Sequence, residues 1–525
     1  MYLFQDFGGR VPTLYNPFQP LSTAGFLLPQ TPFWRVTGFH WHERQSLYKN
    51  APLNTVVFTP VLYGETCIFS ANLDALYQSL ALNSDFHKAP NPTLDMLGTN
   101  VVTSTGDVWK RHRRITAPAF NHSTYENVWD TTIKVYSEML DKEGWRNVDE
   151  TPMADMSKAT HKLALFLIAI VGFNIPMSWN EPPRDDSGRL TAQSMILDVA
   201  KYIMERGLIP KWAYSLGIEK LKRIDEAYNQ FEEFMRERIS ERETELKKLR
   251  AIEGGEANAT ENLKDVFGRL VNARLSEGKQ SLSDRELIGN CFAFTFAGHE
   301  TSANSLAVTL ALLALYPEEQ DWVYRSIVDV VGDRELTFDD FDKLDGVLAC
   351  VYEGVRLFPV AWLMAEIASK DTTLTLSRRD NPEIKEILPV KKGTALYIDT
   401  IGIAYDPRLF PDPEEFRPRR WKKSGKSSSA PTALATQADE VSGSSPATTI
   451  EGFTGFAYGP RTCLGHKFAK VESVCFLTLL LRDWRVVPVM QAGESKEAWR
   501  KRILKPGFGQ ALLIGEVPLK LVRRK

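Results

Sequence analysis

Residues 456–465 read Phe-Ala-Tyr-Gly-Pro-Arg-Thr-Cys-Leu-Gly, and this stretch says more about the fold than any other part of the 525-residue chain. Gly459 and Gly465 allow a tight loop that can pass close beneath a flat ligand, because glycine carries no side chain. Cys463 precedes a helical stretch at 468–475, and the N–H groups at a helix N-terminus stabilise a thiolate. A cysteine taken alone is more often buried and inert, but the whole pattern predicts a functional thiolate in a glycine loop.

The ten residues fill every fixed position of F-x-x-G-x-R-x-C-x-G and so resemble the haem-binding signature of the cytochrome P-450 superfamily. Overall similarity leans towards fungal members of the microsomal type. The resemblance implies haem b as the cofactor, with Cys463 as the axial ligand of the iron and Arg461 as a partner of a haem propionate. Phe456, Gly459 and Gly465 are expected to form the cofactor-binding loop. The implied cytochrome P-450 fold is mainly α with a minor β part (α+β), one large helical domain with small β-sheets.

A second set of motifs concerns support of the haem loop. Glu353 and Arg356 stand three residues apart and lie on one face of a helix; exposed pairs of this kind contribute only about 0–1 kcal/mol. Residues 416–421, Phe-Arg-Pro-Arg-Arg-Trp, resemble the family element F-x-P-x-R-[FW], with Arg419 where the family often has glutamate. The resemblance implies a buried, structural three-part network of Glu353, Arg356 and Arg420.

Residues 297–302, Ala-Gly-His-Glu-Thr-Ser, resemble the family's oxygen-activation motif A-G-x-[DE]-T-[TS]. Gly298 costs about 1 kcal/mol inside a helix, and we expect a close approach of O₂ and a helix kink there. The resemblance makes Thr301, as a hydrogen-bond donor to oxygen, and Glu300, as a source of protons, the candidate catalytic residues. His299 is expected to face away from the iron. The alternative is an ordinary helix whose hydroxyl groups bond back to the preceding turn.

Residues 109–113, Trp-Lys-Arg-His-Arg, resemble the family's W-x-x-x-[RK] element, so Trp109 and Arg113 are expected to bond haem propionates. The alternative is a basic, solvated helix face. A further propionate-binding arginine, which the family often places after the Leu-Phe-Pro of residues 357–359, is missing. This chain reads Leu-Met-Ala-Glu-Ile at 363–367, with the acid Glu366 near the expected cation. Either another base compensates or the alignment is shifted by a residue or two.

The pattern along the chain predicts a lead-in segment over 1–50, rich in aromatics and proline, followed by the cytochrome P-450 domain over 51–525. Two strands are expected to flank a turn between 53 and 71. Apolar residues at helical spacing predict an amphipathic helix over 221–239. Within the domain, residues 423–450 are dominated by Ser, Ala and Thr. They cannot bury enough apolar area to order themselves and are interpreted as a low-complexity surface insertion.

A long helix is expected around the 297–302 motif. Ser283 and Glu286 form a capping box at its start, and the apolar pattern runs to Tyr316, where Pro317 ends it.

Composition excludes several function classes. The net charge is −2 with a pI near 6.5, so no basic excess points to nucleic acid. Five cysteines, an odd and sparse set without a C-x-x-C pair, argue against a disulfide framework and a structural zinc site. The N-terminus shows no secretory signal and no apolar run of the about 20 residues needed to span a bilayer.

A thiolate opposite O₂ favours O–O cleavage, so the predicted reaction inserts one oxygen atom of O₂ into a lipophilic organic substrate. No nucleotide fingerprint lies between a predicted strand and helix, so electrons must come from a partner. The resemblance implies NADPH–cytochrome P-450 reductase, with cytochrome b5 as an additional partner. Lysines near the cysteine loop could form a docking patch or an ordinary solvated face: Lys422, Lys423, Lys426, Lys467 and Lys470.

By the resemblance, the substrate pocket is lined by residues 88–105, by 359–367 and by the aromatic residues Phe292, Phe294 and Phe296. Sterol, terpene and aromatic substrates all remain open. Fungal members usually lie on the cytoplasmic face of the endoplasmic reticulum membrane, and residues 208–214 are an amphipathic candidate for touching a bilayer.

Two other functions remain open. A haem-thiolate isomerase or dehydratase would need neither O₂ nor a reductase, but would have no use for the proton relay at Glu300 and Thr301. A non-enzymatic haem sensor would have no use for a long helix lined with substrate-contacting residues.

Overall fold

In the computed structural model the chain divides into two compact units. The first comprises residues up to Ala89, Tyr352–Cys463 and Pro506–Leu512; the second comprises Pro90–Val351, Leu464–Lys505 and Leu513–Lys525. The structure describes residues 11–29, 31, 33–253, 263, 265–277, 281–422 and 452–524. The insertion predicted at 423–450 lies outside the described residues.

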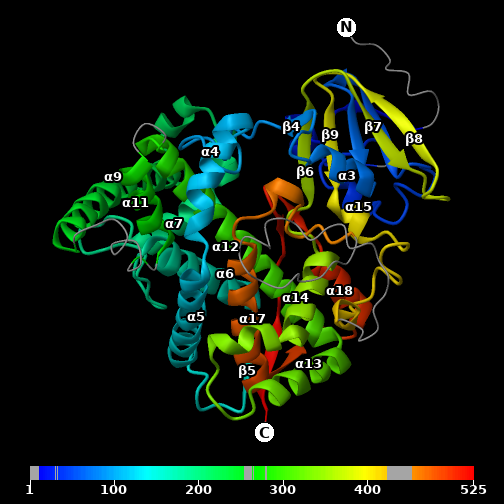
Figure 1. The fold of residues 1–525 in the computed structure, drawn as a ribbon. Helices are drawn as coiled ribbons and strands as arrows, with labels where there is room; N and C mark the ends of the chain where they lie inside the picture. The colour runs from blue at the N-terminus through cyan, green and yellow to red at the C-terminus, as the bar shows by residue number, and fades with distance from the viewer. Residues whose placement is uncertain are drawn as a thin grey trace. The chain divides into compact units, whose positions relative to one another are not determined.

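The first unit is built on a six-stranded sheet (Figure 1). Its order is β1 (Thr13–Phe18), β2 (Thr55–Tyr63), β3 (Cys67–Ser70), β9 (Ala395–Asp399), β6 (Leu363–Ala368) and β4 (Phe86–Lys88). The predicted strand pair is confirmed as β2 and β3, which run antiparallel with Val57 opposite Ile68. β1, within the predicted lead-in, pairs in parallel with β2. The boundary at residue 50 stays a prediction.

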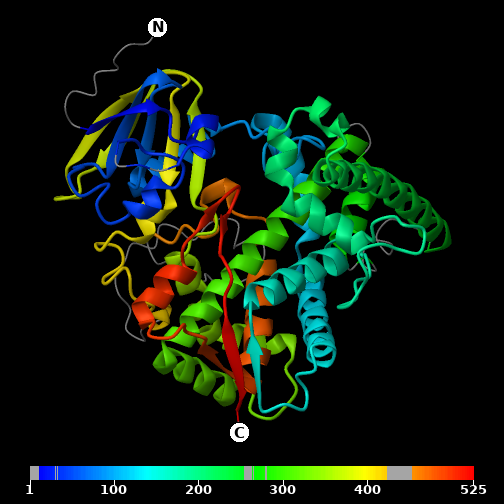
Figure 2. The same cartoon turned by 180° about the vertical axis from the view of Figure 1, so that it is seen from behind.

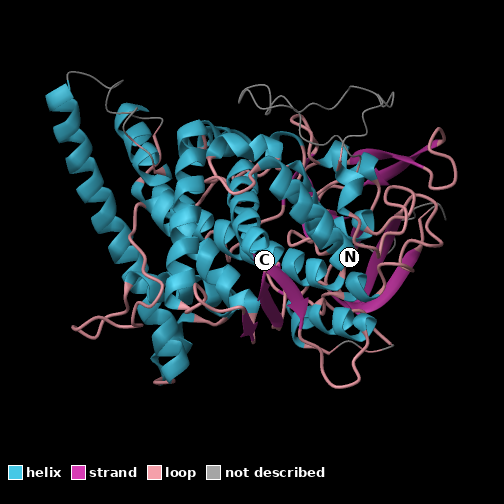
Figure 3. Ribbon diagram, turned by 90° about the horizontal axis from the view of Figure 1, so that it is seen from below, coloured by secondary structure: helices cyan, strands magenta, loops and turns pink. Residues whose placement is uncertain are grey.

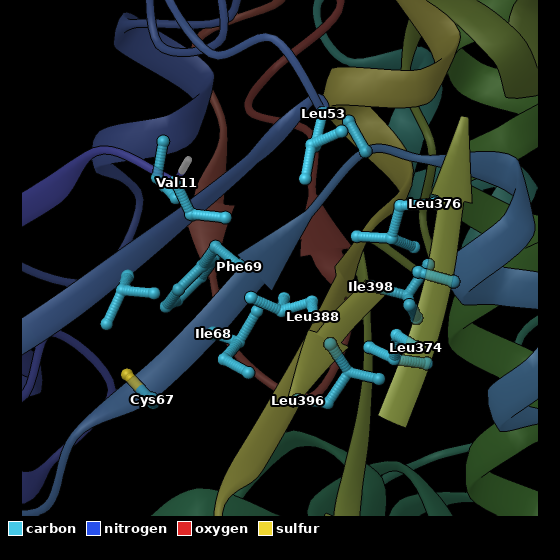
Figure 4. Close-up of a cluster of buried hydrophobic side chains, with 14 of the residues drawn as sticks. Val11, Leu53, Cys67, Ile68, Phe69, Leu374, Leu376, Leu388, Leu396 and Ile398 are labelled. Carbon is cyan, nitrogen blue, oxygen red and sulfur yellow. The ribbon is translucent and has the colours of Figure 1, made fainter. Parts of the chain in front are cut away.

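The core of this unit is a cluster of aliphatic and aromatic side chains on the sheet (Figure 4). Ile68, Phe69 and Leu396 are fully buried there. Antiparallel β7 (Thr372–Ser377) and β8 (Lys385–Val390) add Leu374, Leu376 and Leu388 to the same cluster. The helices of this unit include α1 (Thr23–Leu27), α2 (Phe39–His42), α3 (Leu73–Ser79) and α15 (Thr400–Ala404).

The second unit is mostly helical, and helix dominates the ribbon in Figure 3. The helices that position the candidate residues are α4 (Gly106–Thr116), α5 (His122–Lys142), α6 (Met156–Leu167), α12 (Asp284–Leu315) and α17 (His466–Asp483). The others are α7 (Ala192–Lys201), α8 (Ile203–Leu208), α9 (Glu219–Glu253), α11 (Val266–Glu277), α13 (Pro317–Val330) and α18 (Lys496–Ile503). α12 packs against α6, and α17 packs against α5.

The small sheet of this unit joins β10 (Trp484–Pro488), β13 (Leu519–Arg523) and β5 (Glu150–Met153). Figure 2 shows β13 and β5 side by side, although they lie far apart in the sequence. A two-stranded pair, β11 (Gly507–Phe508) and β12 (Leu512–Leu513), precedes β13. α14 (Asp345–Leu357) crosses the boundary between the two units in sequence.

The helices read from periodicity are confirmed. The segment 221–239 lies within α9, where Ile224, Tyr228, Phe231, Met235 and Ile239 are buried. α12 begins at Asp284, directly after its N-cap Ser283, and the predicted Ser283–Glu286 capping box is present. The helix ends at Leu315, one residue before the predicted end.

Candidate functional site

The cysteine loop presents one accessible thiol. Cys463 is exposed, whereas the other four cysteines are buried. Its N–H donates to the Phe456 carbonyl at 2.9 Å, which closes the loop. The Thr462 hydroxyl donates to the Gly459 carbonyl at 2.7 Å and secures the turn before the cysteine. The loop therefore places this thiol at an accessible position.

Two residues of this loop have a left-handed backbone, Ala457 with φ 59° and Gly459 with φ 62°. A side chain at Gly459 would also stand 3.2 Å from the Leu80 carbonyl oxygen, so glycine is needed there for conformation and for space. At Gly465 a β-carbon would meet nothing within 4 Å. An exposed thiol beside open space and next to Arg461 fits a flat, anionic, thiolate-ligated group such as haem.

The structure brings Glu353, Arg356 and Arg420 together in the first unit. Arg356 donates from Nε and Nη2 to the two Glu353 carboxylate oxygens at 2.9 and 2.8 Å. Arg420 Nε donates to Glu353 Oε1 at 3.1 Å. Two further groups donate hydrogen bonds to the Glu353 carboxylate: the Trp421 indole N–H at 2.8 Å and the Arg417 backbone N–H at 2.9 Å.

Both partners of the central pair are buried, Glu353 at 0% and Arg356 at 2% exposure. The remaining Arg356 N–H groups donate to the carbonyls of Ala404, Pro413 and Glu415. The guanidinium therefore holds the chain at 404–415 onto α14, and the network is fully hydrogen-bonded at its centre.

Replacing Glu353 with alanine is expected to lower the free energy of unfolding by about 3–5 kcal/mol, because removal of one partner leaves a buried, uncompensated guanidinium. Denaturant unfolding and haem content of the purified protein measure the effect. The control is Glu219→Ala, which removes the acid of an exposed i,i+3 pair with Lys222 and should change the free energy by less than about 1 kcal/mol. Equal, small effects of both substitutions would contradict a supporting role for Glu353.

In the second unit α12 is buried from Leu287 to Leu315 except at Ala297, Gly298, Glu300 and Thr301. The accessible residues are therefore the predicted oxygen-activation residues. The Thr301 hydroxyl donates to the Ala297 carbonyl at 2.6 Å. This is the back-bonding geometry of an ordinary helix, and it leaves the lone pairs of the hydroxyl oxygen as acceptors.

Burial raises the pKa of Glu300 to about 7. A carboxyl group with such a pKa exchanges its proton readily near neutral pH, as a general acid or base should. Glu300 and its neighbour Thr301 thus combine a proton source with a hydroxyl group at the accessible stretch of the helix.

Gly298 lies where α12 packs closely on a neighbouring segment, and the expected approach of O₂ and the kink stay predictions. α12 is one uninterrupted α-helix through this residue. A β-carbon at Gly298 would stand 3.0 Å from Cδ1 of Ile168, in the π-helical segment Ile168–Gly172 after α6. A larger residue at position 298 would have to displace the Ile168 side chain, so the glycine suits the close packing of the two helical segments.

His299 is buried, and its ring packs edge to face against His161 of α6 with centroids 5.4 Å apart. Burial lowers the pKa of His299 to about 3, so the ring is neutral. That His299 faces away from the iron stays a prediction.

Trp109 and Arg113 lie four residues apart on α4, and so on one helix face. The intervening His112 was not singled out from the sequence. It is fully buried and contacts the start of α12: Nε2 lies 3.2 Å from Glu286 Oε1, and Nδ1 lies 3.0 Å from Asn290 Nδ2. Because Asn290 Nδ2 is a donor, Nδ1 accepts and Nε2 carries the proton to the carboxylate. His112 thereby holds the helix of Trp109 and Arg113 against α12.

The predicted pocket rings are buried in this unit. Phe292 packs against Tyr228 and Phe231 of α9, and Phe294 packs edge to face against Phe120. Of the predicted lysine patch, Lys422 is exposed and Lys467 lies over the Tyr125 ring at 5.1 Å. Lys423 and Lys426 lie outside the described residues.

Glu472 on α17 is a second residue that pattern reading did not identify. It is fully buried in an apolar helix. Burial raises its pKa to about 8, and the nearby Ser302 hydroxyl on α12 offsets only part of this rise. Glu472 is therefore a neutral acid at neutral pH, next to the residue that follows Thr301.

Replacing Glu472 with glutamine is expected to flatten the dependence of stability on pH. The folded protein binds the Glu472 proton more tightly than the unfolded chain, whose glutamate has a pKa of about 4.5. The resulting stabilisation is complete below about pH 4.5 and is lost as the pH rises through about 8. Above that pH the glutamine variant should be more stable than the wild type by denaturant unfolding. The control is Glu237→Gln, which replaces an exposed glutamate on α9. If the stability of Glu472→Gln changed with pH in parallel with that of the wild type, as expected for the control, Glu472 would already be ionised in the folded protein.

Comparison with known proteins concerns the family and the fold of this chain. The family model described as cytochrome P-450 matches residues 29–508. Cytochrome P-450 monooxygenase 124 of Postia placenta is 34% identical over 439 residues, which are 82% of this chain and 78% of the relative. Cytochrome P-450 monooxygenase prx9 of Penicillium rubens is 26% identical over 88% of this chain and 80% of its own.

Among solved structures, a zebrafish cytochrome P-450 with progesterone matches at a TM-score of 0.66 and 17% identity. The match covers 92% of this chain and 99% of that chain. It confirms the predicted fold class, mainly α with a minor β part.

Proposed function

The chain belongs to the cytochrome P-450 family and is a haem-thiolate monooxygenase, and we propose that it hydroxylates a lipophilic organic substrate with electrons drawn from NADPH through NADPH–cytochrome P-450 reductase. The observation that carries this proposal is the accessible stretch of α12, where Glu300, with a pKa of about 7, adjoins the Thr301 hydroxyl. An enzyme that activates O₂ needs such a proton supply, whereas a haem-thiolate isomerase or dehydratase does not.

We assign haem b as the cofactor: the Cys463 thiolate would bind its iron, and Phe456, Gly459 and Gly465 would shape the loop that holds it. Arg461, Trp109 and Arg113 are the proposed donors to the haem propionates. When bound, the thiolate-ligated haem supplies the O₂ chemistry, because the thiolate pushes electron density towards O–O cleavage. Glu353, Arg356 and Arg420 support the loop without touching the reacting atoms.

In the proposed mechanism the Glu300 carboxyl supplies protons, and the Thr301 hydroxyl keeps a delivered proton in place through a hydrogen bond. The Thr301 Oγ1–H already donates to the Ala297 carbonyl, so Oγ1 can accept a hydrogen bond from a protonated oxygen. Rotation of the hydroxyl would let it donate instead. His112 fixes α4 against the start of this helix, and Glu472 is a buried neutral acid beside Ser302.

A reductase partner, with cytochrome b5 as a second donor, is proposed because members of this family receive electrons from a redox partner. Lys422 and Lys467 of the predicted lysine patch would contribute to docking by steering an acidic partner. O₂ and the lipophilic substrate complete the set of reactants.

We also propose attachment to the cytoplasmic face of the endoplasmic reticulum membrane. Leu208, Trp212, Leu216 and Ile218 are each more than half exposed around the 3₁₀ segment Lys211–Leu216, while Tyr214 is buried. Exposed apolar side chains next to Lys211, Lys220 and Lys222 suit the interface of an anionic bilayer. Within the described ranges, no helix is long and apolar enough to cross a membrane.

The proposed function is tested by turnover of the purified holoenzyme with NADPH, the reductase and ¹⁸O₂. Lipophilic compounds that displace the water ligand of the haem, seen optically, are the substrates to test. We expect one ¹⁸O atom in the product and no turnover without reductase or O₂. Conversion in the absence of both would instead support an isomerase or dehydratase.

A further inference from the structure

The loop of residues 94–104, which precedes α4 in the second unit, is braced by one of its own side chains. The Asn100 side chain is fully buried and donates to two carbonyls of the loop, at 2.9 and 3.2 Å. Its Oδ1 accepts hydrogen bonds from two backbone N–H groups of the loop, at 3.0 and 3.2 Å. Because one buried side chain ties both halves of the loop together, we expect the loop to move as one piece. The four partners are Leu94, Gly98, Val102 and Thr103.

A single buried amide joins this loop to α12. Asn290, fully buried, accepts a hydrogen bond at its Oδ1 from the Val101 N–H at 2.9 Å. The amide has a fixed orientation, because its Nδ2 donates to the Glu286 carbonyl at 2.7 Å and lies 3.0 Å from His112 Nδ1. Within the described ranges, no other hydrogen bond runs from residues 94–104 to a different helix or strand. Asn290 therefore fixes the loop to the helix through one oriented bond.

Close packing of two backbones completes this contact. Gly289 precedes Asn290 in α12, and a β-carbon at Gly289 would collide with the carbonyl oxygen of Gly98. A β-carbon at Gly98 would in turn collide with the carbonyl oxygen of Arg285. Backbone atoms cannot swing aside as the end of a flexible side chain can. The loop can therefore lie this close to α12 only because both positions are glycine.

The loop adjoins a part of α12 that is predicted to line the substrate pocket. Phe294 follows Asn290 by four residues, so it lies on the same helix face, one turn further along. Phe294 and residues 88–105 both belong to the predicted lining. The bond to Asn290 and the backbone contact at Gly289 thus hold one predicted wall of the pocket against another.

We infer that Asn290 and Gly289 are specificity-determining residues, which hold the 94–104 loop closed against α12 and thereby exclude bulky ligands. Both act through the loop and are positioning residues. The inference rests on the proposed haem site and pocket, and it adds two residues that the motifs do not contain. A ligand that needs the loop displaced binds only the open fraction of the protein, so its apparent binding is weakened by that fraction. A small ligand that needs no displacement is not affected.

The test uses two azoles that bind haem iron through an imidazole nitrogen and shift its absorption spectrum. One is imidazole itself, and the other is 1-tritylimidazole, in which the ring carries a bulky group of three phenyl rings. Stopped-flow mixing with the ferric holoenzyme gives an association rate constant for each azole. Asn290→Leu removes the bond to Val101 at nearly constant volume. Gly289→Ala keeps the amide but forces the loop outward, and alanine suits a helix interior better than glycine.

Both variants should bind 1-tritylimidazole about tenfold faster than the wild type, the factor that corresponds to one lost hydrogen bond of ordinary strength. Imidazole should bind at the wild-type rate in both. The control is Thr295→Val, which removes a different buried hydrogen bond of α12, from the Thr295 hydroxyl to the Cys291 carbonyl at 2.9 Å. This bond does not involve the loop, so the control should change neither rate.

Thermal unfolding of each holoenzyme separates specificity from stability. A purely structural role predicts that Asn290→Leu alone responds, in proportion to its lost stability, and this result would overturn the inference. An unchanged ratio of the two rate constants in both variants would overturn it as well. If Asn290→Leu does not retain haem, the ratio measured for Gly289→Ala decides alone. Failure of the proposed function would appear in the wild type, where neither azole would shift a haem-thiolate spectrum.

Discussion

Replacing Cys463 with alanine is expected to abolish the thiolate-type carbonyl spectrum of the reduced protein and all oxygenation with it. Cys463 is the exposed thiol of a loop closed by its own N–H on Phe456, while the other four thiols are buried. Burial raises the pKa of Cys291 and of Cys475, so these thiols resist the ionisation that iron binding requires. The measurement is the absorption spectrum of the dithionite-reduced, CO-saturated protein, together with haem content.

The matched control is Cys291→Ala, a substitution of a buried thiol on α12 that should keep the thiolate-type spectrum. Retention of that spectrum in Cys463→Ala would mean that another cysteine binds the iron. The assignment of the loop, and of Arg461 within it, would then be wrong.

Replacing Thr301 with alanine is expected to uncouple NADPH oxidation from product formation. The hydroxyl lies on the accessible stretch of α12, next to Glu300 with its pKa of about 7. A positioned proton-transfer group contributes about 10²–10⁴-fold in rate, so product should fall steeply while NADPH consumption continues and hydrogen peroxide accumulates. The lost bond to the Ala297 carbonyl is worth only about 1 kcal/mol, so the protein should remain folded and haem-loaded.

Two variants make this test specific. Thr309→Ala removes the same kind of bond, from a buried hydroxyl to the Ser305 carbonyl at 2.8 Å, and should leave coupling unchanged. Thr301→Ser keeps a hydroxyl group and should restore most of the product. An unchanged ratio of product to NADPH in Thr301→Ala would remove Thr301 from the mechanism.

Gly298 shows how a short sequence pattern can leave one neighbour of a residue unnamed. A glycine in a helix interior signals close approach, but the pattern does not say of what. Helix packing on Ile168 depends on the crossing of α12 and α6, which are brought together by contacts distant in sequence.

By itself the sequence determined the features that depend on local spacing. The cysteine loop, the i,i+3 pair of Glu353 and Arg356, the capping box of α12 and the β2–β3 hairpin could all be read within short windows. The reason is physical: helix faces, caps and tight turns are set by neighbouring residues and their backbone geometry.

Only the tertiary structure decided what depends on pairing between distant segments. Lys88 and Glu366 are 278 positions apart in the sequence and become neighbours only because β4 pairs with β6. Glu472 becomes a neutral acid only because α17 is buried around it. A pKa is set by desolvation and by charges a few ångströms away. Neither quantity exists until the chain has folded, so the short motifs could not reveal these two features.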